Sequence, residues 1–200
     1  MPSSYTNDIA YSRHNSEYYF NRGVDAYKEK NYDEAIHCFK RVVVINPKNA
    51  DAYCKLGAIY FFKGDIETAI IYYKKSIAID PAFAKAYHNL GVAYGCKGYN
   101  ETSIIHYKKA IAIDPELANA YAGLGIAYRI KGDNETAIYY CKKAISINPE
   151  DAFSYVVLGH AYDRNRETGS YYLEKAYDLD PSLRNGSFSA GIPLDNYSLN

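Results

Sequence analysis

The sequence contains no tryptophan, one methionine and no excess of charge of either sign. Its 23 Lys and Arg residues balance 23 Asp and Glu residues, so the chain has no overall attraction for nucleic acid or for an anionic membrane. No apolar run approaches the roughly 18 residues that a membrane span requires, and no signal-peptide core follows Met1. We therefore expect a cytoplasmic protein with no nucleic-acid partner and no integral membrane segment.

Residues that support catalysis or metal binding are few and scattered. The four cysteines form no C-x-x-C pair, and they read as buried small hydrophobes in a reducing compartment: Cys38, Cys54, Cys96 and Cys141. The five histidines lack metal-ligand spacing, and neither a G-x-S-x-G elbow nor a phosphate-binding glycine loop is present. The sequence therefore predicts no metal site, no cofactor and no enzymatic activity.

Proline marks an internal repeat. Pro47, Pro81, Pro115 and Pro149 are each 34 residues apart, and Pro181 follows after 32. The phrase "KKAIAIDPELANAYAGLGIAY" recurs in close variants at the same interval. A fixed period of this size is typical of stacked supersecondary units.

Each unit has two helix-ending signals. Proline cannot continue a helix and disfavours the α conformation in the residue before it, so a helix ends at each repeated proline. A glycine that follows a lysine, at Gly64, Gly98 and Gly132, is typical of a helix C-terminus. The sequence therefore predicts an all-α fold in which every unit is a helix-turn-helix pair; we call the two members helix A and helix B.

Helix A carries one recurring stripe of residues. Tyr53, Leu56, Gly57 and Tyr60 follow the spacing of one helix face, and the same pattern returns in the next three units. Glycine inside a helix costs about 1 kcal/mol relative to alanine. A glycine that returns at one position therefore predicts a close helix contact that a Cβ atom would prevent. The abundant tyrosines, 24 in all, are expected to fill the gaps between helices.

The aromatic-x-x-Leu-Gly-x-x-Tyr motif, the small residues Ala35, Ala69 and Ala137 in helix B, and the closing proline resemble the tetratricopeptide repeat (TPR) family. The resemblance implies an α-solenoid, a right-handed superhelix of hairpins. We expect five repeats after an N-terminal flexible arm (1–15) and before an irregular tail (184–200): 16–49, 50–83, 84–117, 118–151 and 152–183. The end units depart from the motif, as with Arg22 for Leu and Gly169 for Ala, which is common where a unit faces solvent.

The C-terminal end of the array lacks an obvious covering helix. Gly186, Gly191 and Pro193 interrupt the tail, so a regular helix is not expected there. Two alternatives remain open. Apolar tail residues such as Phe188 fold back over the last hairpin, or a second chain covers it and the protein is a homo-oligomer through this end.

The resemblance implies a concave groove lined by a second stripe of helix A. Part of this stripe could instead pack against the neighbouring unit, and this alternative stays open for each residue. The candidate groove residues are Phe20, Val24, Tyr27, Cys54, Ala58, Phe61, Phe62, Lys85, His88, Asn89, Val92, Asn119, Ala122, Ile126, Arg129 and Ile130.

The resemblance implies a non-catalytic module that binds a peptide or helix of a partner protein. In the first three units only Lys85 matches the two-carboxylate clamp of chaperone-binding relatives, so we expect no tight binding of chaperone C-terminal tails. The alternative is a self-associating scaffold of a larger assembly, since small chains of this family include magnetosome-, pilus- and secretion-associated proteins.

Overall fold

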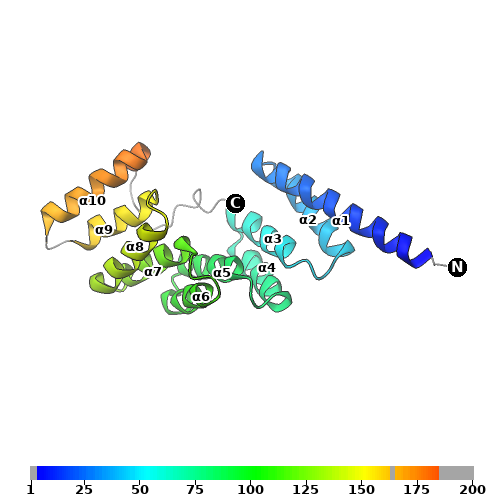
Figure 1. The fold of residues 1–200 in the computed structure, drawn as a ribbon, viewed down its shortest axis with the longest axis horizontal. Coiled ribbons are helices and arrows are strands. Elements are labelled where there is room, and N and C mark those ends of the chain that lie inside the picture. Colours follow the sequence, from blue (N-terminus) through cyan, green and yellow to red (C-terminus); the bar gives the residue numbers. More distant parts are fainter. Residues whose placement is uncertain (1–3, 163–164, 185–200) are drawn as a thin grey trace. The chain divides into compact units, whose positions relative to one another are not determined.

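The computed structural model describes residues 4–162 and 165–184, and within these ranges every regular element is helical (Figure 1). The α-helices are α1 (Ser4–Lys28), α2 (Tyr32–Ile45), α3 (Ala50–Phe62), α4 (Ile66–Ile79), α5 (Ala84–Cys96), α6 (Asn100–Ile113), α7 (Ala118–Ile130), α8 (Asn134–Ile147), α9 (Ala152–Ala161) and α10 (Arg166–Leu179), followed by the 3-10 helix η1 (Pro181–Arg184). The predicted all-α fold of helix-turn-helix pairs is confirmed. The chain forms two compact units, the first ending at Ala86 and the second beginning at Tyr87.

Polar side chains fix where several helices begin. Asn49 precedes α3, and its side-chain oxygen accepts a hydrogen bond of 2.9 Å from the backbone N–H of Ala52. Asp133 does the same for Thr136 at 3.0 Å before α8. Such caps satisfy backbone donors that have no partner within the helix. The short polar residues between the hairpins therefore determine helix boundaries as well as solubility.

The B helices end just before the repeated prolines. Helix α4 ends at Ile79, and Asp80 then accepts a hydrogen bond of 2.9 Å from the backbone N–H of Ala82, across Pro81. The same turn recurs after α6, where Asp114 accepts from Glu116. The aspartate side chain and the proline thus close each B helix together.

The A-to-B turns depend on a left-handed residue. Gly64, Gly98 and Gly132 have φ angles of 82°, 78° and 80°, which L side chains rarely adopt. In the first hairpin Lys30 occupies this conformation with φ 59°. The turn is the same in both cases: the N–H of Asn31 reaches the carbonyl of Ala26, as that of Asp65 reaches Tyr60.

Lys30→Gly is expected to stabilise the protein. Lysine in the left-handed region carries a steric cost that glycine lacks, and the gain should be about 0.5–1 kcal/mol after the greater freedom of glycine in the unfolded chain is subtracted. Urea unfolding monitored by circular dichroism measures this difference. A loss of stability would mean that the strain at Lys30 is smaller than the entropy that glycine adds to the unfolded state.

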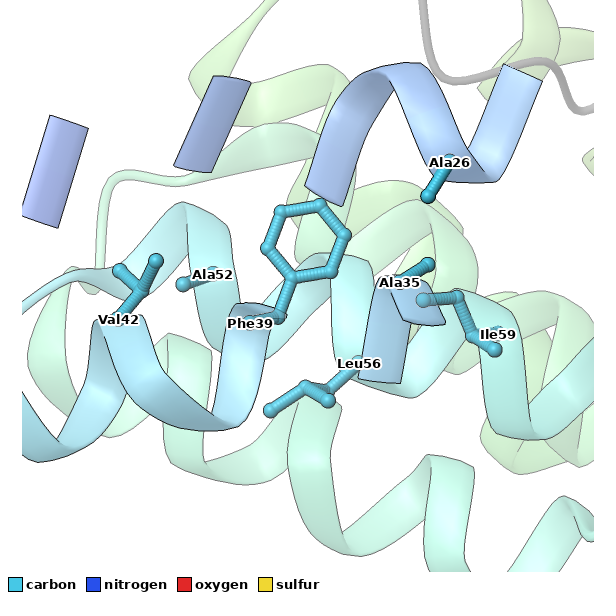
Figure 2. Packing of buried hydrophobic residues seen from close by; sticks show 7 residues of the cluster. All are labelled: Ala26, Ala35, Phe39, Val42, Ala52, Leu56 and Ile59. Atoms are coloured by element: carbon cyan, nitrogen blue, oxygen red, sulfur yellow. The ribbon is translucent and has the colours of Figure 1, made fainter. Parts of the chain in front are cut away.

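A buried aromatic ring organises the core of the first hairpin. Phe39 of α2 is fully buried and lies among small and branched side chains from α1, α2 and α3 (Figure 2). The ring of Phe20 meets it edge to face at 5.6 Å. A Cβ atom at Gly23 of α1 would lie only 3.0 Å from the Phe39 ring. The absence of a side chain at Gly23 therefore lets α1 and α2 approach closely.

The same contact recurs in the later hairpins, as the repeated helix-A glycine predicted. In each, a Cβ atom on that glycine would collide with one helix-B side chain, which we call the knob whatever its size. The glycine and knob pairs are Gly57 and Tyr73, Gly91 and Tyr107, Gly125 and Cys141, and Gly159 and Leu173. The predicted close helix contact is confirmed at these positions.

Tyrosine is abundant because stacked rings recur in the hairpins. Tyr60 of α3 stacks on Tyr72 of α4 at 5.4 Å, and Tyr128 of α7 stacks on Tyr140 of α8 at 5.6 Å. Lys40 lies over the Tyr60 ring at 5.9 Å, and its hydrogen bond to Tyr60 is the main cause that raises the pKa of Lys40. These contacts connect one hairpin to the next as well as the two helices within a hairpin.

The N-terminal segment differs from the expectation. We expected a flexible arm over residues 1–15, whereas helix α1 begins at Ser4 and continues through this segment to Lys28. No glycine or proline lies between residues 4 and 15, so nothing in the local sequence stops the helix from extending backward from its packed half.

At the C-terminal end of the described chain, Leu183 of η1 packs against the buried cluster that contains Tyr155 and Val156. Residues 185–200, which include the proposed covering residue Phe188, lie outside the described part of the chain.

Candidate interaction surface

The structure divides the sixteen candidate groove residues by exposure. Six are buried: Cys54, Ala58, Phe61, His88, Val92 and Ala122. Eight are half-buried: Phe20, Val24, Tyr27, Phe62, Asn89, Asn119, Ile126 and Arg129. Lys85 and Ile130 are exposed. A ligand cannot reach the six buried side chains, so the accessible candidate surface is smaller than the predicted stripe.

His88 illustrates why part of the stripe is buried. Its ring lies 5.5 Å from the ring of Tyr107, the knob of the same hairpin, and only 4% of the residue is exposed. Burial lowers the pKa of His88 to about 3, so the imidazole is neutral at physiological pH. His88 is therefore a core residue rather than a ligand-binding histidine.

Three aromatic rings come together in the first unit. Tyr27 of α1 and Phe62 of α3 have ring centroids 6.1 Å apart, and Tyr32 of α2 stacks on Phe62 at 6.3 Å. Burial raises the pKa of Tyr27, which keeps its hydroxyl protonated. The sequence reasoning found Tyr27 and Phe62 and missed Tyr32. An aromatic directly after the capping Asn31, where later repeats place Ile66 or Asn100, was the available signal.

Positive charge gathers beside these helices in the first unit. Burial lowers the pKa of Lys55 on α3, and the nearby charges of Lys85 and Lys28 lower it further, against the opposing effect of Asp51. A lysine that is partly buried near other lysines gains from an incoming carboxylate. Lys55 thus lies near two further lysines, Lys85 and Lys28, as well as near Asp51.

In the second unit, the accessible end of α7 carries Arg129 and Ile130. Ile126 packs against the buried cluster of Cys141, Val157 and Leu158, so it contributes mainly to the core. Arg129 is half-buried, and its Nε is buried without a hydrogen-bond acceptor. Ile130, the next residue, is 48% exposed. The half-buried Arg129 guanidinium can donate hydrogen bonds to a carboxylate while the exposed Ile130 contacts an apolar group of the same ligand.

The A helices α5, α7 and α9 differ from the B helices α6, α8 and α10 in the sign of their charged side chains. Helices α5, α7 and α9 contain no aspartate or glutamate, and their ionisable groups of possible positive charge include Lys85, Arg129 and His160. The B helices α6, α8 and α10 carry both signs. The strongly charged side chains of α5, α7 and α9 are thus cations, Lys85 and Arg129.

Two features of the described residues bear on metal binding and on thiol chemistry. They include no group of three His, Cys, Asp or Glu side chains placed to hold a metal ion. Cys38 is buried, and burial, together with the charge of Glu34, raises its pKa to about 11, so its thiol is protonated and a weak nucleophile at neutral pH. No described helix combines the length and the hydropathy needed to cross a membrane.

The hairpins, the knob-and-glycine contacts and the capped turns define a helical-hairpin repeat protein. Family models described as TPR repeat match residues 25–64, 59–98 and 96–129, and one described as tetratricopeptide repeat matches 118–151. The chain belongs to the tetratricopeptide repeat family, and its fold is of the α-solenoid class. Repeats of this family form protein-interaction modules in general.

Solved structures of similar fold cover most of the chain. A crystal structure of the MamA protein is 29% identical with a TM-score of 0.68, and the match covers 88% of this chain and 97% of MamA. TTC0263, a thermophilic TPR protein of Thermus thermophilus, is 22% identical with a TM-score of 0.71 over 85% of this chain and 94% of its own. PilF of Pseudomonas aeruginosa is 19% identical with a TM-score of 0.74 over 92% and 85%. No curated protein matches the chain significantly.

Proposed function

We propose that the chain is a non-catalytic interaction module that binds a partner polypeptide on the surface of its A helices. The bound segment carries apolar side chains together with at least one acidic side chain. Within the second unit the contact centres on Arg129 and Ile130, and within the first unit on Tyr27, Phe62 and the lysines around Lys55.

The observation that carries this proposal is the buried, unsatisfied Nε of Arg129 next to the exposed Ile130. The Nε itself is out of a ligand's reach, but the accessible part of this half-buried guanidinium gains charge-assisted hydrogen bonds from a partner carboxylate. The absence of acidic residues from α5, α7 and α9 supports the same ligand charge, since nothing on these helices repels a carboxylate.

The proposed ligand differs from the acidic C-terminal tails that chaperone-binding relatives hold. Those tails need a clamp of several cations and asparagines, of which Lys85 alone is matched in the first three units. A single guanidinium beside apolar residues instead suits an internal segment, in which burial of apolar side chains provides most of the affinity and the carboxylate orients the segment.

A displayed library of random peptides, selected on the full chain, tests the ligand class. Enriched sequences should combine apolar residues with aspartate or glutamate. Arg129→Glu should weaken their binding at least ~10-fold because it reverses the charge that meets the carboxylate. Ile130→Asp should weaken binding ~10–100-fold through lost apolar burial and added repulsion. Fluorescence polarisation with a selected, labelled peptide measures both.

The matched control is Ile105→Asp, which places a charge on an equally exposed isoleucine of helix B in the same unit. Peptide binding should survive this change. The proposal is overturned if Ile105→Asp loses peptide binding and Ile130→Asp keeps it, because the ligand would then bind to the B helices. Enriched peptides without acidic residues would contradict the role of Arg129.

A further inference from the structure

The second unit exposes a row of large apolar side chains on its B helices. Ile105 of α6 is 54% exposed, Tyr139 of α8 is 56% exposed and Tyr171 of α10 is 61% exposed. We call these residues the outer ladder. They occupy the same position in successive repeats, and nothing in the proposed peptide-binding surface uses them.

The knobs fix the direction in which the outer ladder points. Tyr107, Cys141 and Leu173 each face a helix-A glycine, and each lies two residues after a member of the ladder. Two residues along an α-helix correspond to about 200° of rotation. The ladder therefore lies on the side of each B helix that is turned away from the A helices of its hairpin.

Charged residues flank every member of the ladder in the same order. An exposed glutamate stands four residues before it and an exposed lysine four residues after it, one helical turn away on either side. The three sets are Glu101, Ile105 and Lys109; Glu135, Tyr139 and Lys143; and Glu167, Tyr171 and Lys175. The B helices of the second unit thus carry an acidic row, an apolar row and a basic row. Glu101 also pairs with Lys131 at 2.8 Å, and the ammonium groups of Lys109 and Lys175 lie over the A-helix rings of Tyr87 and Tyr155.

Local helix energetics account for the two charged rows but not for the apolar one. Glutamate near a helix N-terminus and lysine nearer the C-terminus both suit the helix dipole. Tyr139 and Tyr171 contact the rings of Tyr140 and Tyr172 edge to face, at 5.1 and 5.3 Å, and more than half of each remains exposed. Large apolar side chains exposed at one position in three successive repeats are suited to a surface that another molecule covers.

We propose that a second copy of this chain covers the outer ladder. Two copies of this face, related by a two-fold axis that runs along the ladder, bring apolar row onto apolar row. The same operation places the acidic row of each copy opposite the basic row of the other, so Glu135 faces Lys143 of the partner subunit. After this two-fold rotation each acidic row faces a basic row and the apolar row faces itself. An isologous interface requires such self-complementarity.

In the first unit the B helix α4 carries the same pattern, whereas α2 has His37 at the ladder position. Ile71 of α4 is 54% exposed and stands between Glu67 and Lys75 at the same spacing. A peptide ligand of unrelated sequence has no reason to match an acidic, an apolar and a basic row together. A second copy of the chain matches them because it carries the same three rows. The ladder's charge order therefore favours self-association over other occupants. This proposal is independent of the peptide-binding function of the A helices.

Sedimentation velocity of the full chain, from low micromolar to near-millimolar concentration, tests the interface. The wild type should show a concentration-dependent monomer–dimer equilibrium. Tyr139→Glu changes the middle residue of the outer ladder and should raise the dimer dissociation constant ~30-fold, which is the scale of losing one central interface residue. Ile130→Asp, on helix A of the same unit, is the matched control and should leave the equilibrium unchanged.

A charge exchange identifies the two-fold arrangement. The double variant Glu135→Lys, Glu167→Lys and the double variant Lys143→Glu, Lys175→Glu should each be monomeric alone, because like charges then meet across the axis. Mixed together, they should form a heterodimer. Circular dichroism on each variant checks that the helices are intact.

Three results would overturn the proposal. The wild type could be a strict monomer throughout the concentration range. It could form a dimer that Tyr139→Glu does not weaken, or the two charge variants could fail to associate when mixed. If Ile130→Asp weakens the dimer and Tyr139→Glu does not, self-association belongs to the A helices instead. The peptide-binding test would then have to be made on monomeric protein.

Discussion

Gly123→Val is expected to lower the free energy of unfolding by about 3 kcal/mol, the upper part of the range for inserting bulk into a packed core. Gly123 lies on α7, and a Cβ atom there would lie 2.5 Å from the ring of Tyr107 on α6. The same ring also packs closely against α5, where a Cβ at Gly91 would lie 2.8 Å from it, so it has little room to move. Tyr107 thus fills the space between two glycines and is 1% exposed.

The next hairpin solves the same packing problem with the sizes reversed. Its knob is the small Cys141, and the position equivalent to Gly123 in the following A helix is Val157. Cys141 and Val157 belong to one buried cluster. In these two hairpins the large knob is followed by glycine and the small knob by valine, so here the knob and the next A helix fill one shared space. The pairing is particular to these hairpins, since the large Tyr73 is followed by Asn89 at the equivalent position.

Tyr107→Cys together with Gly123→Val copies the Cys141 and Val157 arrangement into the third hairpin. Tyr107→Cys alone should cost about 3 kcal/mol through the cavity it leaves. The double variant should lose about 1–2 kcal/mol, far less than the sum of the two single changes, because the valine fills the space that the ring vacated. Urea unfolding of the wild type and the three variants completes the cycle. Additive losses would show that the two side chains do not share one space.

The sequence predicted the contacts within a hairpin better than those between hairpins. The close helix contact at Gly57 and its equivalents could be predicted because the same residue returns at one position. The repeated prolines predicted the helix ends. The role of Gly123 was not legible from its own repeat, since it depends on the size of Tyr107 in the preceding one. Comparing Tyr107 and Cys141 with the residues that face them on the next A helix supplies the missing signal for this position.

The candidate binding surface was harder to predict for a related physical reason. The second stripe of helix A is apolar whether it packs against a neighbouring helix or faces a ligand, so Phe61, His88 and Val92 looked like Ile130. Only the packing distinguishes them. The helical start of the chain was missed because residues 4–15 lack both apolar periodicity and helix breakers, and the absence of a breaker was the more informative of the two.

His88 should make the protein sensitive to mild acid. Its pKa is lowered by burial to about 3 from an ordinary value of 6.5. The unfolded chain therefore binds a proton between these values that the folded chain does not, and stability is complete above pH 6.5 and falls as the pH decreases toward 3. The loss by pH 4.5 should be about 2–3 kcal/mol, at roughly 1.4 kcal/mol for each pH unit.

His88→Cys separates this effect from other acid-induced changes. It places at position 88 the residue that the preceding repeat holds at Cys54, so the core remains apolar and of tolerable size. Urea unfolding at pH 7 and pH 4.5 should show a smaller loss for His88→Cys than for the wild type by about 2 kcal/mol. His37→Cys, at an exposed histidine of α2, should behave as the wild type. Equal losses in all three proteins would mean that the folded state admits a proton or water to His88, and that this part of helix A is more open than its burial indicates.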